Sequence, residues 1–105
     1  MTKSFKGKYS KEDITLAGFA RALSHPARIA ILRHLAAYNN CCFNEISKEI
    51  PLADSTVSQH MAELKKAGLI QGSFKLPRIK YCINAKNWKL ARKYFKELTK
   101  TKITK

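Results

Sequence analysis

The hydrophobic pattern of this chain changes its period at Gly68. Before that glycine, apolar residues recur three and four positions apart, the spacing that places them on one face of a helix. After it, Ile79, Tyr81 and Ile83 alternate with other residues, which is the two-residue period of a half-buried strand. The chain is therefore expected to begin as a series of helices and to continue into a short hairpin.

Two helices are expected in the first third of the chain. Ser10 begins a pattern that resembles a capping box, ahead of a helix over residues 11–23. Ser24-His25-Pro26 interrupts that helix and starts the next, because Ser caps helices and Pro is tolerated in a first turn. The second helix is expected to end near Tyr38, before two turn-prone asparagines.

A short third helix is expected next. Phe43, Ile46 and Ile50 share one face of a helix of about two turns. Pro51 ends this helix, because the residue before a proline is pushed out of the helical region.

A fourth helix occupies the segment 53–68. Asp54 or Ser55 is expected to cap it, since each side chain has an oxygen that accepts a bond from a backbone N–H. Gly68 supplies its stop. With the helix before it, this segment forms a helix-turn-helix. Its buried face is expected to carry Val57, Met61 and Leu64.

A hairpin and a long helix complete the chain. Residues 69–74 and 79–83 predict two short strands, joined by a tip at 75–78. Residues from Asn84 to about Lys100 predict a helix with one apolar and one basic face. The expected fold class is mainly α with a small β-hairpin, the winged helix-turn-helix, in which the hairpin is the wing.

The charge of the chain is strongly positive. Lys and Arg number 21 against 7 Asp and Glu, which gives a formal net charge of +14. A small domain this basic is typical of proteins that bind a polyanion, most often nucleic acid. An anionic membrane surface and a merely solubilising charge excess are the alternatives.

We expect one domain over residues 10–100, between a loose basic arm at 1–9 and a basic tail at 101–105. No stretch approaches the roughly 18 apolar residues that span a bilayer, and the N-terminus lacks the apolar region of a secretory signal. Three cysteines do not make a disulfide framework. These features predict a cytoplasmic protein with reduced thiols and no membrane partner.

The fourth helix carries the side chains expected to contact double-stranded DNA. Gln pairs with adenine through both groups of its amide, and Ser or Thr contacts a base or a phosphate. Gln59 is the best candidate for a base contact, because no capping role explains it. Serines at a helix start also fit caps, and His60 also fits packing against a neighbouring helix. The expected DNA-contacting residues of this helix are Ser55, Thr56, Ser58, Gln59, His60 and Lys65.

The wing is the second element expected at DNA. It carries Lys75, Arg78 and Lys80. A basic hairpin tip suits phosphate contact or insertion into the minor groove. A solvated charged turn is the alternative.

Two stretches of the sequence resemble the ArsR/SmtB family of bacterial regulators. The first is ALSHPARIAIL, from Ala22 to Leu32, and the second is STVSQHMAELKKAGL, from Ser55 to Leu69. The likeness extends over about residues 14–98. It implies a homodimer that binds an operator with inverted-repeat character and represses transcription. In that family an inducer, often a metal or metalloid ion, releases the DNA.

The same resemblance implies where two copies meet. In the family, the first and last helices form the dimer interface. The alternative is that the apolar residues of these helices complete the core of a single copy. The corresponding residues of this chain are Leu16, Phe19, Trp88, Tyr94, Phe95 and Leu98.

The metal-sensing signature of the family is incomplete here. Many members carry Cys-x-Cys in the short third helix, where Cys42 matches the first cysteine and Asn44 replaces the second. Other members bind metal through the last helix, which here has no His and a single acid, Glu97. The sequence therefore does not supply the about four ligands that a tetrahedral metal site needs, and we assign no cofactor.

The cysteines at 41, 42 and 82 leave two interpretations open. If the wing strand approaches the third helix, Cys41, Cys42 and Cys82 form a sensor for a thiophilic metalloid or metal ion, or Cys42 and Cys82 form a redox switch. Otherwise they are small, partly buried apolar residues. The histidines are expected on three different helices, as core or surface residues; they are His25, His34 and His60.

The expected function is sequence-specific DNA binding by a homodimeric repressor that an inducer or a thiol-directed signal releases. An enzyme is not expected, because the chain offers no nucleophile with a base, no phosphate-binding glycine loop and no paired acids in a recognisable motif. One alternative is a nucleoid-type or RNA-binding protein that uses charge alone. The other is a winged protein-interaction module without DNA binding.

Overall fold

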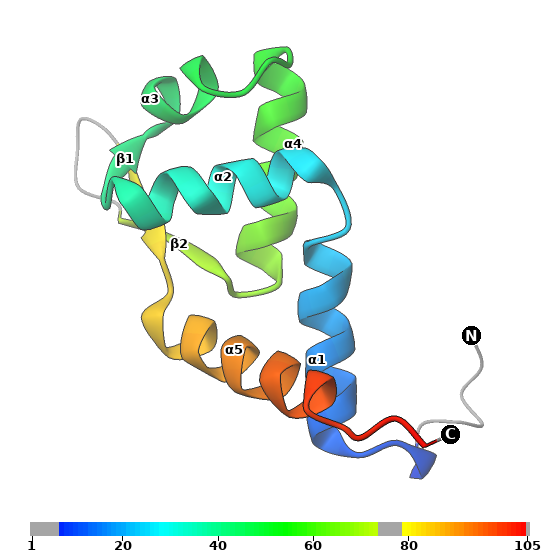
Figure 1. Cartoon of the computed structure of the whole chain (residues 1–105). Helices are drawn as coiled ribbons and strands as arrows, with labels where there is room; N and C mark the ends of the chain where they lie inside the picture. The colour runs from blue at the N-terminus through cyan, green and yellow to red at the C-terminus, as the bar shows by residue number, and fades with distance from the viewer. Residues whose placement is uncertain (1–6, 74–78, 105) are drawn as a thin grey trace.

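The computed structural model describes residues 7–73 and 79–104 (Figure 1). The first helix, α1, spans Lys11–Ala22. The hydroxyl oxygen of Ser10 accepts a hydrogen bond from the backbone N–H of Asp13 at 3.0 Å. This bond confirms the predicted start of the first helix, because it satisfies one of the N–H groups that a helix leaves open.

The second helix, α2, spans Pro26–Ala37 and has Pro26 in its first turn, as expected. Its cap is His25 rather than Ser24. The Nδ1 atom of His25 accepts a hydrogen bond from the backbone N–H of Ala27 at 3.0 Å. Because an accepting imidazole nitrogen carries no proton, this cap needs Nδ1 deprotonated.

The fourth helix, α4, spans Asp54–Lys66. The predicted side-chain cap at Asp54 or Ser55 is wrong, because Ala53 holds the N-cap position and no side chain bonds there. The carboxylate of Asp54 accepts a hydrogen bond from the hydroxyl of Ser47 instead. This acid therefore ties α4 to the preceding helix, which a pattern of residue types along the chain does not reveal.

Three strands form one antiparallel sheet in the order β1-β3-β2. β2 (Ile70–Ser73) and β3 (Lys80–Ile83) confirm the predicted wing. β1 (Cys41–Cys42) leads directly into α3 (Phe43–Lys48) and pairs with β3. Nothing in the sequence pattern predicts β1, because two residues are too few to show a period.

The core lies between α1, α2, α4 and the sheet, and α1 also packs against α5 (Ala85–Thr99). Each fully buried Leu or Ile contributes roughly 1.5–3 kcal/mol relative to an exposed one. The predicted buried face of α4 is confirmed. The core residues are Phe19, Ala22, Ala27, Ile31, Leu32, Leu35, Cys41, Ile46, Ile50, Val57, Met61, Leu64, Leu69, Ile70 and Ala91.

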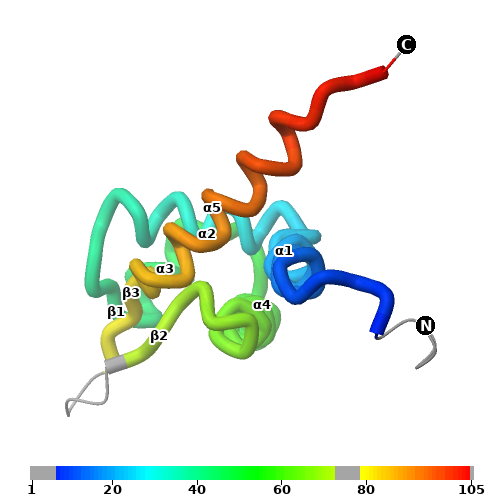
Figure 2. The backbone as a smooth tube through the Cα atoms, turned by 90° about the horizontal axis from the view of Figure 1, so that it is seen from below, coloured from blue at the N-terminus to red at the C-terminus, as the bar shows by residue number. Residues whose placement is uncertain are grey.

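The C-terminal end of α5 projects beyond the compact part of the molecule (Figure 2), and its residues Tyr94, Glu97 and Leu98 line a hollow with the start of α1. Leu98, near its end, is 58% exposed. Among the described residues, no helix is both long enough and apolar enough to cross a membrane.

Candidate nucleic-acid interface

Helix α4 is the predicted recognition helix, the one expected to contact DNA, and it has two distinct faces. Val57, Met61 and Leu64 are buried, at the spacing that defines one side of a helix. Ser55, Ser58 and Gln59 are exposed on the other side, and Lys65 is exposed near the end of the helix. Thr56 lies between the two faces and is half-buried. The predicted contacts at 55, 58 and 59 therefore share one solvent-facing surface.

His60 differs from its neighbours on α4, because its side chain is buried with 9% exposure. Its Nδ1 atom accepts a hydrogen bond from Nε of Arg28 on α2 at 3.1 Å. Its ring lies against that of His25, with the ring centroids 4.3 Å apart. The structure thus shows the alternative expected for His60, packing against a neighbouring helix.

The histidines do not lie on three different helices. His25 caps α2 and His34 lies within the same helix, while His60 belongs to α4. The expectation was wrong because the proline that follows His25 begins α2, and so places the histidine at the cap of that helix. The fold then brings His25 and His60 into contact across 35 positions of sequence.

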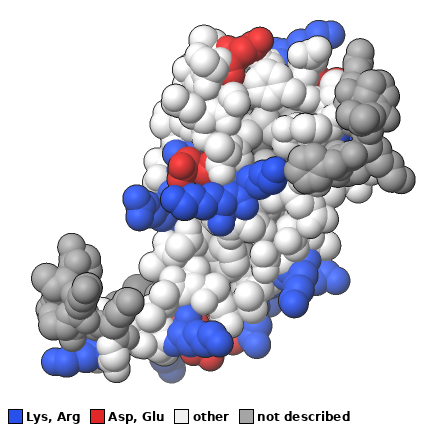
Figure 3. Space-filling model, turned by 180° about the vertical axis from the view of Figure 1, so that it is seen from behind, with Lys and Arg blue, Asp and Glu red and all other residues white. Residues whose placement is uncertain are grey.

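Of the three basic residues predicted on the wing, Lys80 is the one that lies in the described part of the chain. It begins β3 and is exposed. The other two predicted wing contacts, Lys75 and Arg78, lie outside the described residues. Figure 3 shows Lys and Arg side chains in several clusters over one face, with few acidic side chains among them. A surface of this kind attracts a polyanion over much of its area.

An open pocket of about 510 Å³ lies beside the exposed face of α4. Gln59 and Glu63 line it from α4, and Arg21 and Arg28 line it from α1 and α2. The predicted contact set omits these arginines and Glu63. The sequence shows only that two arginines lie near the ends of neighbouring helices. It does not show that these arginines lie next to α4.

The sheet brings the cysteines near one another, as the pairing of β1 with β3 places Cys42 opposite Lys80. The wing strand therefore approaches the third helix. All three cysteines are thiols rather than disulfides. Cys42 and Cys82 share a face at diagonal positions, which lie roughly 7–8 Å apart in a sheet. Since a disulfide needs Cβ atoms within about 4.5 Å, these strands must shift before the two thiols can join.

Cys41 faces the opposite side of the sheet from Cys42. It is 3% exposed, and its thiol donates a hydrogen bond to the carbonyl oxygen of Tyr38 at 2.7 Å. Burial, followed by the nearby charges of Glu45 and Cys42, raises the pKa of the Cys41 thiol. Such a thiol remains protonated and unreactive at neutral pH. Cys41 thus fits the interpretation as a small apolar core residue.

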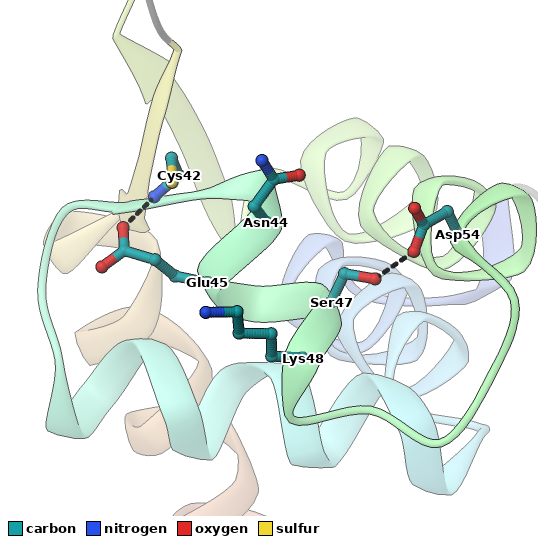
Figure 4. Close-up of a pocket in the computed structure, with 6 residues that line it drawn as sticks. All are labelled: Cys42, Asn44, Glu45, Ser47, Lys48 and Asp54. Carbon is teal, nitrogen blue, oxygen red and sulfur yellow. Dashed lines mark hydrogen bonds between the residues drawn. The ribbon is translucent and has the colours of Figure 1, made fainter.

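Cys42 is also buried, with 5% exposure, and it lines a second open pocket of about 530 Å³ at the start of α3 (Figure 4). The carboxylate of Glu45 accepts a hydrogen bond from the backbone N–H of Cys42 at 2.8 Å. This bond, first among several causes, lowers the pKa of Glu45. The pocket extends to Ser47 and Asp54, so it joins the start of α3 to the start of the recognition helix.

The thiols do not assemble a metal site. Among the described residues, which include all three cysteines, no group of three or more His, Cys, Asp or Glu side chains is placed to hold a metal ion. The two faces of the sheet explain this, because Cys41 and Cys42 are consecutive in a strand and point in opposite directions.

The apolar residues of α1 and α5 divide into two groups. Phe19 is 5% exposed and belongs to the core of the single chain, and Phe95 packs against that core. Trp88 and Leu98 remain 38% and 58% exposed. Half-buried Leu16 and Tyr94 line a hollow of about 220 Å³ between α1 and α5, together with Leu98.

Three acidic residues line the same hollow. Glu12 and Asp13 line it from α1, and Glu97 lines it from α5. These are three of only seven acidic residues in the chain. The charged residues that line this hollow are therefore all acidic, in contrast to the net charge of +14 of the chain.

Comparisons with known proteins agree with this layout. The family model described as bacterial regulatory protein, arsR family, matches residues 25–71, from the cap of α2 to the first strand of the wing. The HTH-type transcriptional regulator YgaV of Escherichia coli (strain K12) is 34% identical over 67 residues, which cover 64% of this chain and 68% of that protein.

Solved structures share the fold. An ArsR-like transcriptional regulator from Rhodococcus sp. RHA1 has a TM-score of 0.68 at 23% identity, covering 83% of this chain and 82% of that one. The transcriptional repressor BigR from Xylella fastidiosa has a TM-score of 0.63 at 22% identity, covering 99% and 100%. With its winged helix-turn-helix and its matching sequence, the chain belongs to the ArsR family of bacterial transcriptional regulators and carries their DNA-binding helix-turn-helix.

Proposed function

We propose that this protein is a sequence-specific DNA-binding repressor that acts as a homodimer. The observation that carries the proposal is the exposed polar face of α4, where Ser55, Ser58 and Gln59 lie opposite a fully buried stripe. A recognition helix with this division enters the major groove with its N-terminal residues at the base edges. Repression is supported by the likeness to BigR, a transcriptional repressor.

The contacts divide into base and phosphate contacts. Gln59 carries the amide that pairs with adenine, while the hydroxyl groups of Ser55 and Thr56 suit phosphate or base. Exposed Lys65 on α4 and exposed Lys80 on β3 supply positive charge for phosphate contacts. Lys75 and Arg78 extend the proposed phosphate contacts along the wing. His60 supports α4 from within the fold.

The proposed dimer joins the α1–α5 faces of two copies. Trp88 and Leu98 supply exposed apolar surface, and the end of α5 extends beyond the core where a second copy can cover it (Figure 2). The carboxylates at the hollow, among them Glu97, suit the lysines of a partner's α5. A two-fold dimer binds an operator with inverted-repeat character, because each copy contacts one half-site.

Selection of bound duplexes from a random pool tests this function. We expect recovery of an inverted repeat whose half-site centres lie about one helical turn apart, roughly 10 bp. Binding without enrichment of any sequence would instead identify a nucleoid-type protein. Retention of no DNA would identify a protein-interaction module.

Release by a thiol-directed signal is proposed to act at Cys42. It lines the pocket that joins α3 to α4, and the Ser47–Asp54 hydrogen bond couples the two helices there (Figure 4). Oxidation by hydrogen peroxide converts a thiol to a sulfenic acid and releases water. We expect peroxide to release the selected operator from the wild-type protein and not from Cys42→Ser, with Cys41→Ser as the matched control. Equal release from both variants would exclude Cys42 as the sensor.

A further inference from the structure

The guanidinium of Arg28 joins three helices at one point. Its Nε atom donates a hydrogen bond to Nδ1 of His60 on α4 at 3.1 Å. Its Nη1 atom donates to the carbonyl oxygens of Ala22 and Arg21, at the end of α1, at 3.4 and 3.5 Å. Because Arg28 itself lies on α2, one side chain fixes the recognition helix relative to both α1 and α2.

This arrangement exists in one protonation state. His60 accepts a bond through Nδ1 from Arg28, and His25 accepts a bond through Nδ1 from the backbone N–H of Ala27. An imidazole nitrogen that accepts a hydrogen bond is unprotonated, so both rings are neutral in this geometry. The centroids of the two rings are 4.3 Å apart.

Protonation of His60 would destabilise this arrangement, because positively charged groups surround its ring. A proton on Nδ1 of His60 removes the acceptor that Arg28 uses, and it places a second positive charge beside the guanidinium. His25 faces His60 from the cap of α2, and Arg21 lines the adjoining pocket from α1. Glu63, one turn along α4 in the same pocket, is the single carboxylate among the residues that line it.

We propose that Arg28 is the positioning residue of the recognition helix, acting through His60, and that the neutral form of His60 is required for DNA binding. This inference rests on the proposed DNA-binding function. His60 directly follows Gln59, so a movement of the His60 side chain out of its contact with α2 displaces the proposed base-contacting residue. Acid therefore weakens DNA binding in this protein.

The environment of His60 supports the inference. Burial, followed by the charges of His25 and Arg28, lowers the pKa of His60. Ordinary electrostatics predicts the opposite effect of acid on DNA affinity. Additional positive charge on a DNA-binding protein strengthens its attraction to phosphate, so the sign of the pH effect separates the two explanations.

The experiment measures the affinity for a duplex recovered by selection, by fluorescence anisotropy at fixed salt from pH 7.5 to pH 5.5. We expect the wild-type affinity to fall on acidification, with a limiting slope of about tenfold per pH unit for one linked proton. The side chain of His60→Gln does not titrate, so we expect the loss of affinity on acidification to disappear in this variant. His34→Gln, a histidine of α2 outside this cluster, is expected to keep the wild-type profile.

A second measurement does not depend on DNA. The measurement is a pH titration of the full chain followed by two-dimensional ¹H–¹⁵N spectra. We expect the amide signals of Gln59 and its neighbours on α4 to shift with pH, with the same midpoint as the titration of the His60 imidazole. His60→Gln abolishes those shifts. Amide signals that ignore the His60 titration would overturn the positioning role, and so would wild-type binding that is unchanged or tighter in acid. Failure of the proposed function appears separately, as a lack of specific binding at pH 7.5 while the spectra still respond.

Discussion

The side-chain amide of Asn87 donates a hydrogen bond from Nδ2 to the carbonyl oxygen of Gly68 at 2.9 Å. The bond joins the first turn of α5 to the residue that ends the recognition helix. Gly68 has a φ of 83°, and a Cβ atom at this position would lie 2.7 Å from that same Nδ2. The backbone conformation therefore favours glycine, and a Cβ here would also displace the Asn87 amide from its bond.

Gly68→Ala is expected to destabilise the fold. The left-handed conformation costs about 1–2 kcal/mol for a residue with a Cβ, and displacement of Asn87 adds the loss of one hydrogen bond, about 1 kcal/mol. Urea unfolding measures the change. Gly18→Ala is the matched control, because Gly18 lies within α1 with open space around it. That control is expected to raise stability by roughly 0.5–1 kcal/mol. Equal urea midpoints for Gly68→Ala and the wild type would contradict the expected backbone strain at position 68.

Gln59→Ala is expected to reduce sequence discrimination. If the amide pairs with adenine, its loss removes about 1–3 kcal/mol of discrimination at one position of the operator. Affinities for the selected duplex and for its single-base variants measure the effect. An equal loss on every duplex would show instead that Gln59 contacts phosphate or supports the helix.

Lys80→Ala is expected to weaken binding to all duplexes alike. An exposed lysine at the start of β3 that contacts phosphate releases a counterion, so its removal lowers the slope of log affinity against log salt by about one. Titrations between 50 and 200 mM salt supply the slope. Lys100→Ala, at the far end of α5, is the control and should keep the wild-type slope. A wild-type slope in Lys80→Ala would remove this residue from the interface.

Leu98→Glu is expected to separate the dimer without unfolding the chain. The side chain is 58% exposed in a single copy, so a charge there is solvated in the monomer and buried only in the dimer. Sedimentation at micromolar concentration is expected to show dimers for the wild type and monomers for the variant. Thr99→Glu adds the same charge one position along α5 and is expected to remain dimeric. A wild-type protein that sediments as a monomer would refute the interface.

The stability of the folded chain is expected to decrease in mild acid because of His60. Its pKa is lowered by folding, chiefly by burial, so the folded state favours the neutral ring more than the unfolded state does. The stabilisation is therefore complete above the unfolded pKa of about 6.5 and decreases as pH falls below that value. Urea midpoints at pH 7.5 and 5.5 measure the loss, which should be smaller in His60→Gln. Identical losses in both proteins would assign the effect to other groups.

The sequence alone determined the elements whose signals are local. The cap at Ser10, the proline that starts α2 and the glycine that ends α4 act within one turn of helix, so their residue types predict the boundaries. The alternation after Gly68 likewise predicts the wing. Because both faces of α4 follow from helical spacing, its exposed residues at 55, 58 and 59 were also predictable.

Only the tertiary structure decided the contacts between distant segments. β1 exists because Cys41 and Cys42 pair with a strand about forty residues away. Ala53 holds the N-cap of α4, and Asp54 accepts a bond from Ser47 on another helix instead of capping. His60 is buried because Arg28 and His25 reach it from α2. Each outcome depends on which segments meet in space, and local spacing carries no record of that meeting. Gly68 shows both cases. The sequence predicted that Gly68 ends α4, but only the tertiary structure reveals its contact with Asn87.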